Sequence, residues 1–140
     1  MERCGRKALT ICQPYAHMII VTHEKKVENR SWYTRYRGPL LIHAGKGRKW
    51  LDGDENELYA SDPLVFGAII GRVQLVDVLH IEQINKGIHD NKYPWLRKHN
   101  HAFGPWCWIL SDIERFEPIP MNGAQGLWNC VGTLPAYISR

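Results

Sequence analysis

Residues 66–81, FGAIIGRVQLVDVLHI, form the longest strand-like segment of the chain and restrict its fold the most. β-Branched and other apolar residues dominate this segment, which is typical of a strand that is largely buried in a sheet. Gly67 and Gly71 interrupt it, and glycines within a strand mark a bend or the close approach of another backbone. The segment therefore predicts a long strand that bends to close a β-barrel.

Shorter segments predict the remaining elements. Apolar runs indicate further strands at residues 8–12, 40–44, 103–110 and 115–119, with residues 26–33 extended. Helical segments are expected at residues 15–22 and 50–59, a loop with a short helix at 85–101, and a turn with one helical turn at 123–128. Together these elements predict an α+β fold, a small mixed β-barrel of five or six strands with two or three short helices around it. The length of 140 residues favours a single domain, residues 1–140.

Positive charge is concentrated in the first part of the chain. Residues 1–50 contain eleven Lys and Arg against three Glu, a net charge of +8, whereas residues 51–140 carry a net charge of −4. This asymmetry favours a basic face for an anionic partner, with nucleic acid as the first candidate. The alternative is a solvated surface with a local charge imbalance.

Metal ligands and targeting signals are not evident in the sequence. The cysteines, which are widely scattered, are Cys4, Cys12, Cys107 and Cys130. A zinc site requires ligands at short spacings, and the close pair His99 and His101 has no carboxylate or cysteine beside it, so we predict no metal and no cofactor. No apolar run approaches the ~20 residues that span a bilayer, and the N-terminus does not resemble a secretory signal. We therefore expect no membrane partner, reduced cysteines and a cytoplasmic location, with the nucleus an option in a eukaryote.

Residues 23–44, HEKKVENRSWYTRYRGPLLIHA, combine cations, aromatic rings and the carboxylates of Glu24 and Glu28 before an apolar strand. Such a mixture makes a poor core and a good ligand surface. If residues 26–33 are extended, side chains alternate, and Glu28, Arg30 and Trp32 share one face. Neither face of this segment is cleanly apolar, which favours a ligand surface over a purely structural strand.

Several motifs resemble the ASCH domain family, the activating signal cointegrator 1 homology domains. The opening Leu9-x-Ile11-x-Gln13-Pro14-Tyr15-Ala16 is similar to theirs, and the family motif GxKxxExR maps onto His23, Lys25, Glu28 and Arg30. Further similar segments are Ser31-Trp32-Tyr33-Thr34, Gly67-Ala68-Ile69-Ile70-Gly71 and Gly126-Leu127-Trp128. His23 departs from the family glycine, and His tolerates a positive φ at some energetic cost. The resemblance extends over about residues 8–134.

The resemblance implies a PUA-like fold with a cleft beside the motif, and a function in binding RNA or other nucleic acid. The basic residues expected to contact phosphates are Lys25, Arg30, Arg35 and Arg37. An unpaired base could stack on Trp32, Tyr33 or Tyr36, and Glu28 could accept a hydrogen bond from a base edge. The alternatives are that Glu28 pairs with Lys25 or Arg30 and that Trp32 covers the barrel.

Three further residues are candidates for the same cleft: Gln13, Tyr15 and Gln125. Each could line it, although local hydrogen bonding explains them equally well.

Two other classes of function stay open. One family branch removes the acetyl group of N4-acetylcytidine, with a lysine at the position of Lys25 and a threonine at that of Glu28. A carboxylate cannot replace that nucleophile, but Glu28 could act as a base for water beside Lys25. A metal-independent ribonuclease is a second possible enzyme activity, and it would require Lys25, Ser31 and Tyr36 to lie together around one phosphate.

The third class is a protein-interaction domain, as in a coactivator-like assembly. Its surface would be formed by Trp95, Trp106 and Trp108. The sequence does not determine the oligomeric state.

Overall fold

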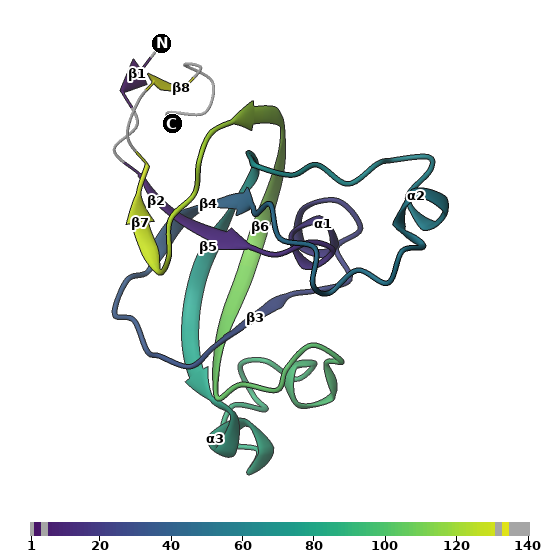
Figure 1. Cartoon of the computed structure of the whole chain (residues 1–140). Helices are drawn as coiled ribbons and strands as arrows, with labels where there is room; N and C mark the ends of the chain where they lie inside the picture. The colour runs from purple at the N-terminus through teal and green to yellow at the C-terminus, as the bar shows by residue number, and fades with distance from the viewer. Residues whose placement is uncertain (1, 4–5, 131–132, 135–140) are drawn as a thin grey trace.

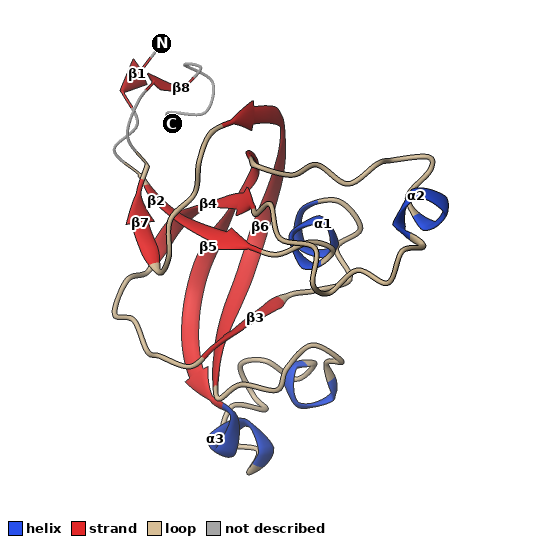
Figure 2. Ribbon diagram, in the orientation of Figure 1, coloured by secondary structure: helices blue, strands red, loops and turns tan. Residues whose placement is uncertain are grey.

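The computed structural model describes residues 2–3, 6–130 and 133–134. Within this part of the chain, six strands form one curled sheet in the order β3-β6-β5-β4-β2-β7 (Figure 1). These strands are β2 (Lys7–Ile11), β3 (Val27–Arg30), β4 (Gly38–Ala44), β5 (Ala68–His80), β6 (Trp106–Pro120) and β7 (Leu127–Asn129). The short strands β1 (Glu2–Arg3) and β8 (Thr133–Leu134) pair with each other beside it. The helices are α1 (Tyr15–Ile20), α2 (Glu55–Leu58) and α3 (Ile81–Asn85), with a 3-10 turn at Leu96–Lys98 (Figure 2).

The long antiparallel pair of β5 and β6 forms the spine of the sheet. Its register shifts at three places, and each shift adds a bend. A Cβ on Gly71 would lie 2.5 Å from the carbonyl oxygen of Glu114 and 2.7 Å from Cδ1 of Ile20. Only glycine therefore allows β6 and α1 to approach β5 this closely. The bending that the glycines predict is confirmed.

The sheet forms a curled half-barrel, because β3 and β7 remain at its two edges among the described residues. The side chain of Arg30 joins one edge to the interior strands by donating from Nη2 to the carbonyl oxygen of Thr10 at 3.0 Å. Helix α1 packs over the inner face, where Ile19 and Ile20 are fully buried against β4 and β5. The α+β fold class, with six strands and three short helices in the described part, is confirmed.

Two element predictions are wrong. Residues 103–110 and 115–119 do not form two strands, because β6 runs continuously from Trp106 to Pro120 with Asp112 at a positive φ of 50° in the middle. The bend at Asp112 absorbs the polar interruption without ending the pairing with β5. Residues 127–129 are a strand, since Leu127 and Trp128 pair with β2 in an antiparallel register. Their predicted helical turn is not formed.

The backbone at His23 explains why the family motif has a glycine there. His23 has a φ of 62°, in the left-handed region that glycine adopts without strain. Its ring nitrogen Nε2 lies 3.2 Å from the carbonyl oxygen of Ile20, at the end of α1. The chain thus turns sharply from α1 into β3. No helix within the described residues is long and apolar enough to cross a bilayer.

Candidate nucleic-acid interface

A groove of about 520 Å³ opens where β3, the end of β2 and the start of α1 meet. Loops after β4 and before β6 complete its rim. Its lining residues are Thr10, Ile11, Cys12, Tyr15, Lys25, Glu28, Asn29, Arg30, Lys49, Trp50 and Phe103. Four of the residues proposed from the sequence therefore meet in one groove, namely Tyr15, Lys25, Glu28 and Arg30.

The centre of the groove is a row of three charged side chains. Oε1 of Glu28 lies 3.4 Å from Nζ of Lys25, and Oε2 lies 2.8 Å from Nη2 of Arg30. Nε of Arg30 also donates to Oε2 at 3.1 Å. The side chains of Lys25, Glu28 and Arg30 are 4%, 10% and 22% exposed. We call this row the Lys25–Glu28–Arg30 triad; it carries a net charge of +1.

Burial dominates the electrostatics of Lys25. Desolvation lowers the pKa of its ammonium below the usual value, and the neighbouring Glu28 carboxylate acts in the opposite direction. The ammonium also lies 5.5 Å from the centre of the Tyr15 ring, a favourable cation–π geometry. Burial likewise lowers the pKa values of His99 and His101, and the Lys25 charge lowers both further. A buried, partly desolvated cation is well placed to interact with an anion or a hydrogen-bond acceptor.

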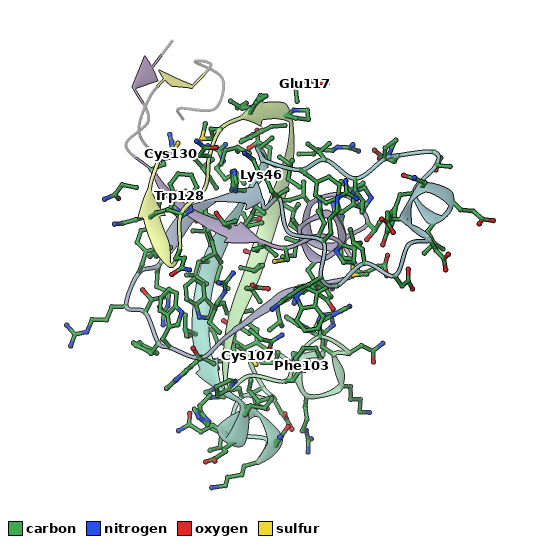
Figure 3. All side chains as sticks on the ribbon, viewed as in Figure 1. Lys46, Phe103, Cys107, Glu117, Trp128 and Cys130 are labelled. Atoms are coloured by element: carbon green, nitrogen blue, oxygen red, sulfur yellow. The ribbon has the colours of Figure 1, made fainter. Side chains whose placement is uncertain are left out.

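Two exposed aromatic rings stand at the rim. Trp50 is 55% exposed and packs its ring edgewise on Tyr15, with ring centres 6.2 Å apart. Phe103 is 62% exposed and lies on the loop before β6, close to Cys107 in Figure 3. Asn29 fixes this loop, since its Oδ1 accepts from the N–H groups of Phe103 and Gly104 at 3.0 and 2.8 Å. Large apolar rings that stay exposed beside a charged groove are suited to stacking on a ligand.

The aromatic residues that follow β3 lie away from the groove lining. β3 ends at Arg30, so Trp32 lies outside the strand and does not line the groove. Trp108 pairs opposite Glu28, and the contact of Trp32 with Trp108 keeps Trp32 on the same side of the sheet as Glu28, as predicted. Trp32 packs on the core with its ring edge on Trp108, at 4.9 Å between centres. The alternative role of Trp32, covering the barrel, is therefore its structural role. The hydroxyl of Tyr36 donates to the carbonyl oxygen of Pro39, and burial raises its pKa.

The two cations of this region differ in their surroundings. Arg37 donates to the carbonyl oxygens of Thr34 and Tyr36 and lies 3.8 Å from a carboxylate oxygen of Asp77. Arg35 is exposed. Neither lines the groove.

The polar candidates from the two ends of the chain are also separate from the groove. Gln13 is fully buried, accepting from the N–H of His17 at 2.9 Å and donating to the carbonyl oxygen of Val65 at 2.8 Å. This is the local hydrogen bonding left open above, and it fixes the start of α1. Gln125 is exposed in the connection before β7. Neither contributes to the groove lining.

The residues suggested for the other functions do not converge. Ser31 and Tyr36 are absent from the groove that holds Lys25, so the set required for a ribonuclease is not assembled there. Trp108 is fully buried, so it cannot form a surface with Trp95 and Trp106. Its burial follows from its position in β6, where it pairs opposite Glu28 beneath the groove.

Several groove residues could not be predicted from the sequence. Thr10, Asn29 and Phe103 come from three separate segments, and only the tertiary structure shows that they meet. A signal did exist for Lys49 and Trp50, because a basic Gly-rich stretch ending in an aromatic residue is typical of a ligand-binding loop. Nζ of Lys49 lies 4.9 Å from the centre of the Trp50 ring.

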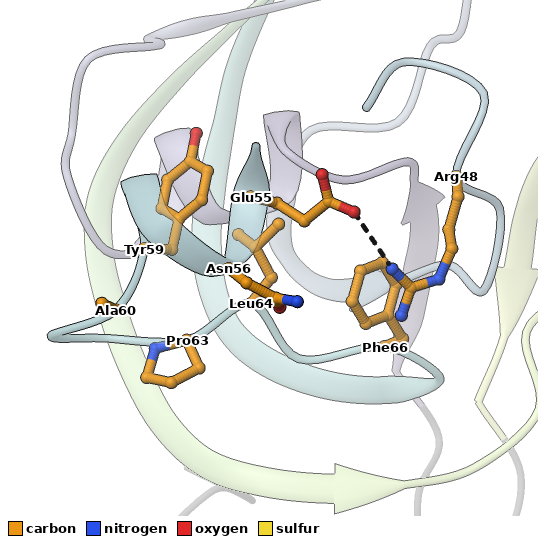
Figure 4. A pocket seen from close by; sticks show the side chains of 8 residues that line it. All are labelled: Arg48, Glu55, Asn56, Tyr59, Ala60, Pro63, Leu64 and Phe66. Carbon is orange, nitrogen blue, oxygen red and sulfur yellow. Dashed lines mark hydrogen bonds and ion pairs between the residues drawn. The ribbon is translucent and has the colours of Figure 1, made fainter. Parts of the chain in front are cut away.

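A second pocket, of about 360 Å³, lies beside α2 (Figure 4). The Arg48 guanidinium stacks over Phe66, 4.2 Å from the ring centre, and lies 3.4 Å from a carboxylate oxygen of Glu55. Its charged groups thus pair with each other across the pocket. Within the described residues, no group of three His, Cys, Asp or Glu side chains is arranged to hold a metal ion. Cys4 lies outside the described residues, Cys12 and Cys107 are free thiols, and Sγ of Cys130 lies 3.7 Å from Sδ of Met121.

Comparison with known proteins identifies the family of this chain. The model of the ASCH domain family matches residues 9–120, and the chain therefore belongs to that family. Its curled six-stranded sheet with short helices is the PUA-like fold expected of the family. Activating signal cointegrator 1 of Homo sapiens is 28% identical over 137 residues, which cover 89% of this chain and 22% of that protein. The Mus musculus protein is 33% identical over 98 residues, covering 61% of this chain and 16% of its own length.

The chain thus spans less than a quarter of either curated relative. Among solved structures, ASCH from Zymomonas mobilis is 14% identical with a TM-score of 0.46, covering 83% of this chain and 73% of that one. A single-residue variant of the same protein is 13% identical with a TM-score of 0.49, covering 86% of this chain and 78% of that one.

Proposed function

We propose that the groove binds nucleic acid, and specifically an unpaired stretch of RNA, whether single-stranded or in a loop of structured RNA. The observation that carries the proposal is the Lys25–Glu28–Arg30 triad, a buried row of net positive charge within a groove whose rim has two exposed aromatic rings. Membership of the ASCH family, which is associated with RNA binding, supports it.

The groove supplies both kinds of contact that unpaired RNA requires. Lys49 on the rim is placed to neutralise a phosphate, and the net positive charge of the triad attracts the anionic strand, which contributes affinity without sequence information. Trp50 and Phe103 offer ring faces to unstacked bases, and each such contact contributes about 1–3 kcal/mol. Stacking requires a base free of its duplex partner, so the groove favours unpaired over double-stranded RNA.

Fluorescence anisotropy with short labelled RNAs tests the proposal. Affinity should fall steeply with salt, because binding releases counterions from the phosphates and added salt reduces the free energy gained by this release. Lys49→Ala should weaken binding and reduce the slope of log affinity against log salt by about one phosphate contact. Arg35→Ala is the matched control, since it removes one positive charge from an exposed site outside the groove lining.

Two outcomes would contradict the proposal. One is that the wild-type chain binds no RNA at low salt. The other is that Arg35→Ala weakens binding while Lys49→Ala leaves it unchanged, because the contact surface would then lie along the connection between β3 and β4.

A further inference from the structure

The hydrogen-bonding capacity of the triad is only partly used. Among the described residues, the Lys25 ammonium has one acceptor, Oε1 of Glu28. Arg30 uses Nε and Nη2 on Glu28 and Thr10, and no described residue accepts from its Nη1. Oε1 of Glu28 receives only the long 3.4 Å contact from Lys25. The groove floor therefore presents a donor, an acceptor and a donor in that order, all from charged groups.

We infer that this row recognises the imide edge of an unpaired uracil, an inference that rests on the proposed binding of nucleic acid. The edge offers O4 as an acceptor, N3–H as a donor and O2 as an acceptor, which complements the row at every position. Lys25 would donate to one carbonyl oxygen, Arg30 to the other, and Glu28 would accept from N3–H. Thymine has the same edge.

The other bases leave the row mismatched. Cytosine presents an amino group, an unprotonated N3 and one carbonyl, so its N3 would face the Glu28 carboxylate with no proton between them. Guanine places two neighbouring donors where the row has one acceptor and one donor. Adenine has only one donor and one acceptor on this edge. A mismatch leaves a desolvated charged group without a partner, and this penalty discriminates more strongly than the gain from a matched contact.

The surroundings of the triad hold a base in the required orientation. The Tyr15 ring, which lies over the Lys25 ammonium, and the Trp50 ring, which packs edgewise on Tyr15, form one wall. Asn29 cannot compete for the base edge, because its amide already bonds to the backbone of His101, Phe103 and Gly104. The triad therefore supplies the selective polar contacts, and the rings supply the stacking.

The test compares hexamers of uridine and cytidine by anisotropy at one salt concentration. Uridine should bind about tenfold more tightly, which is roughly what one hydrogen bond to a charged group contributes. A uridine hexamer with 3-methyluridine, which replaces N3–H by N–CH3, should lose that advantage on the unaltered protein. Thymidine and deoxycytidine hexamers separate the two sources of the edge, since the same preference on deoxyribose shows that the base edge is read without the ribose.

Two variants assign the preference to its atoms. Glu28→Gln keeps the shape but replaces the carboxylate by an amide, so the ratio of uridine to cytidine affinity should fall to within about twofold. Lys49→Ala, on the rim, should weaken both RNAs and keep the ratio. A circular dichroism spectrum and a melting curve establish that Glu28→Gln is folded, and the 3-methyluridine comparison needs no variant at all.

The experiment distinguishes a failure of the proposed RNA binding from a failure of the proposed uracil recognition. If no RNA binds, the proposed function fails and the inference fails with it. If RNA binds but uridine, cytidine and 3-methyluridine hexamers have equal affinity, the function stands and the reading of the imide edge is wrong.

Discussion

Two neighbouring segments that both carry cations play different structural roles in this protein. Residues 25–30 and residues 32–37 each contain cations, and both occur in the stretch that looked like one ligand surface. In the first segment, the charged groups face a groove and retain free hydrogen-bonding capacity. In the second, Trp32 packs on the core, and Tyr36 and Arg37 bond to nearby carbonyl groups. The presence of cations alone therefore does not distinguish a segment that lines the groove from one that covers the core.

The end of β3 separates the two segments. Up to Arg30 the backbone pairs with β6, so alternate side chains are held on a fixed face at the groove. After Arg30 the chain leaves the sheet and crosses to β4, and the rings of Trp32 and Tyr36 pack on the core, where they cover apolar surface. The comparison predicts that substitutions in 25–30 alter ligand binding, whereas those in 32–37 alter stability alone.

Removing the central carboxylate should have the largest effect. Glu28→Ala leaves Lys25 buried without its anion, and a broken buried pair costs about 3–5 kcal/mol of unfolding free energy. Urea denaturation measures the loss. The double substitution Glu28→Ala with Lys25→Met should recover part of it, because no uncompensated ammonium then remains buried. A Glu28→Ala protein as stable as the wild type would show that Lys25 is not held in a desolvated site.

Trp32→Ala should have the next largest effect, and on stability only. The ring is partly buried against Trp108, so its removal should cost about 2–3 kcal/mol, less than for a fully buried tryptophan. RNA affinity of the remaining folded protein should be unchanged. If the fully folded variant binds RNA more weakly than the wild type, Trp32 contributes to binding, and the proposed difference between the two segments is wrong.

Trp50→Ala should weaken RNA binding by about 1–2 kcal/mol while leaving the unfolding free energy nearly unchanged. The ring is 55% exposed, so little buried area is lost. Tyr33→Ala is the matched control, since Tyr33 is an aromatic ring with 47% exposure in the segment 32–37. Equal losses of affinity in the two variants would contradict the placement of the ligand at the groove.

Acidification should lower the stability of the protein through His99 and His101, and this effect should be the smallest of the four. Burial, reinforced by the positive charge of His101 and of nearby lysines, lowers the pKa of His99 below 6.5. In the range between the lowered value and 6.5 the unfolded chain binds more protons, so stability rises with pH and falls on acidification. Protonation would also remove the acceptor Nε2 that bonds to the N–H of Lys26 at 3.0 Å.

Urea denaturation at pH 7.5 and at about pH 5 measures this dependence. His99→Gln should reduce the difference between the two values, with the remainder due to His17 and His101, whose pKa values are also lowered. Lys98→Ala, an exposed neighbour, should leave the difference unchanged. If His99→Gln has no effect on the difference, His99 is not the titrating group.

Much of the fold could be predicted from local patterns. The glycines of the long strand indicated its bending, and Gly71 shows the reason, since a side chain there would collide with Glu114 and Ile20. The interruption in β6 was misread as a gap between strands, because a bend at a positive φ and a loop have the same polar sequence signature. The strand Leu127–Asn129 was missed because its hydrogen-bonding partner is β2, at the far end of the sequence. Such long-range pairing leaves little local signal.

For the candidate site, the sequence by itself determined the motif Lys25, Glu28 and Arg30 and the extended backbone that carries it, because spacing and residue type are local properties. It also indicated that a glycine-like backbone precedes the motif, which the φ of His23 confirms. Only the tertiary structure decided that Tyr15, Trp50 and Phe103 surround this row while Trp32 does not. The physical reason is that burial and contact depend on which segments the curled sheet brings together, and β3, β2 and two loops meet only after folding.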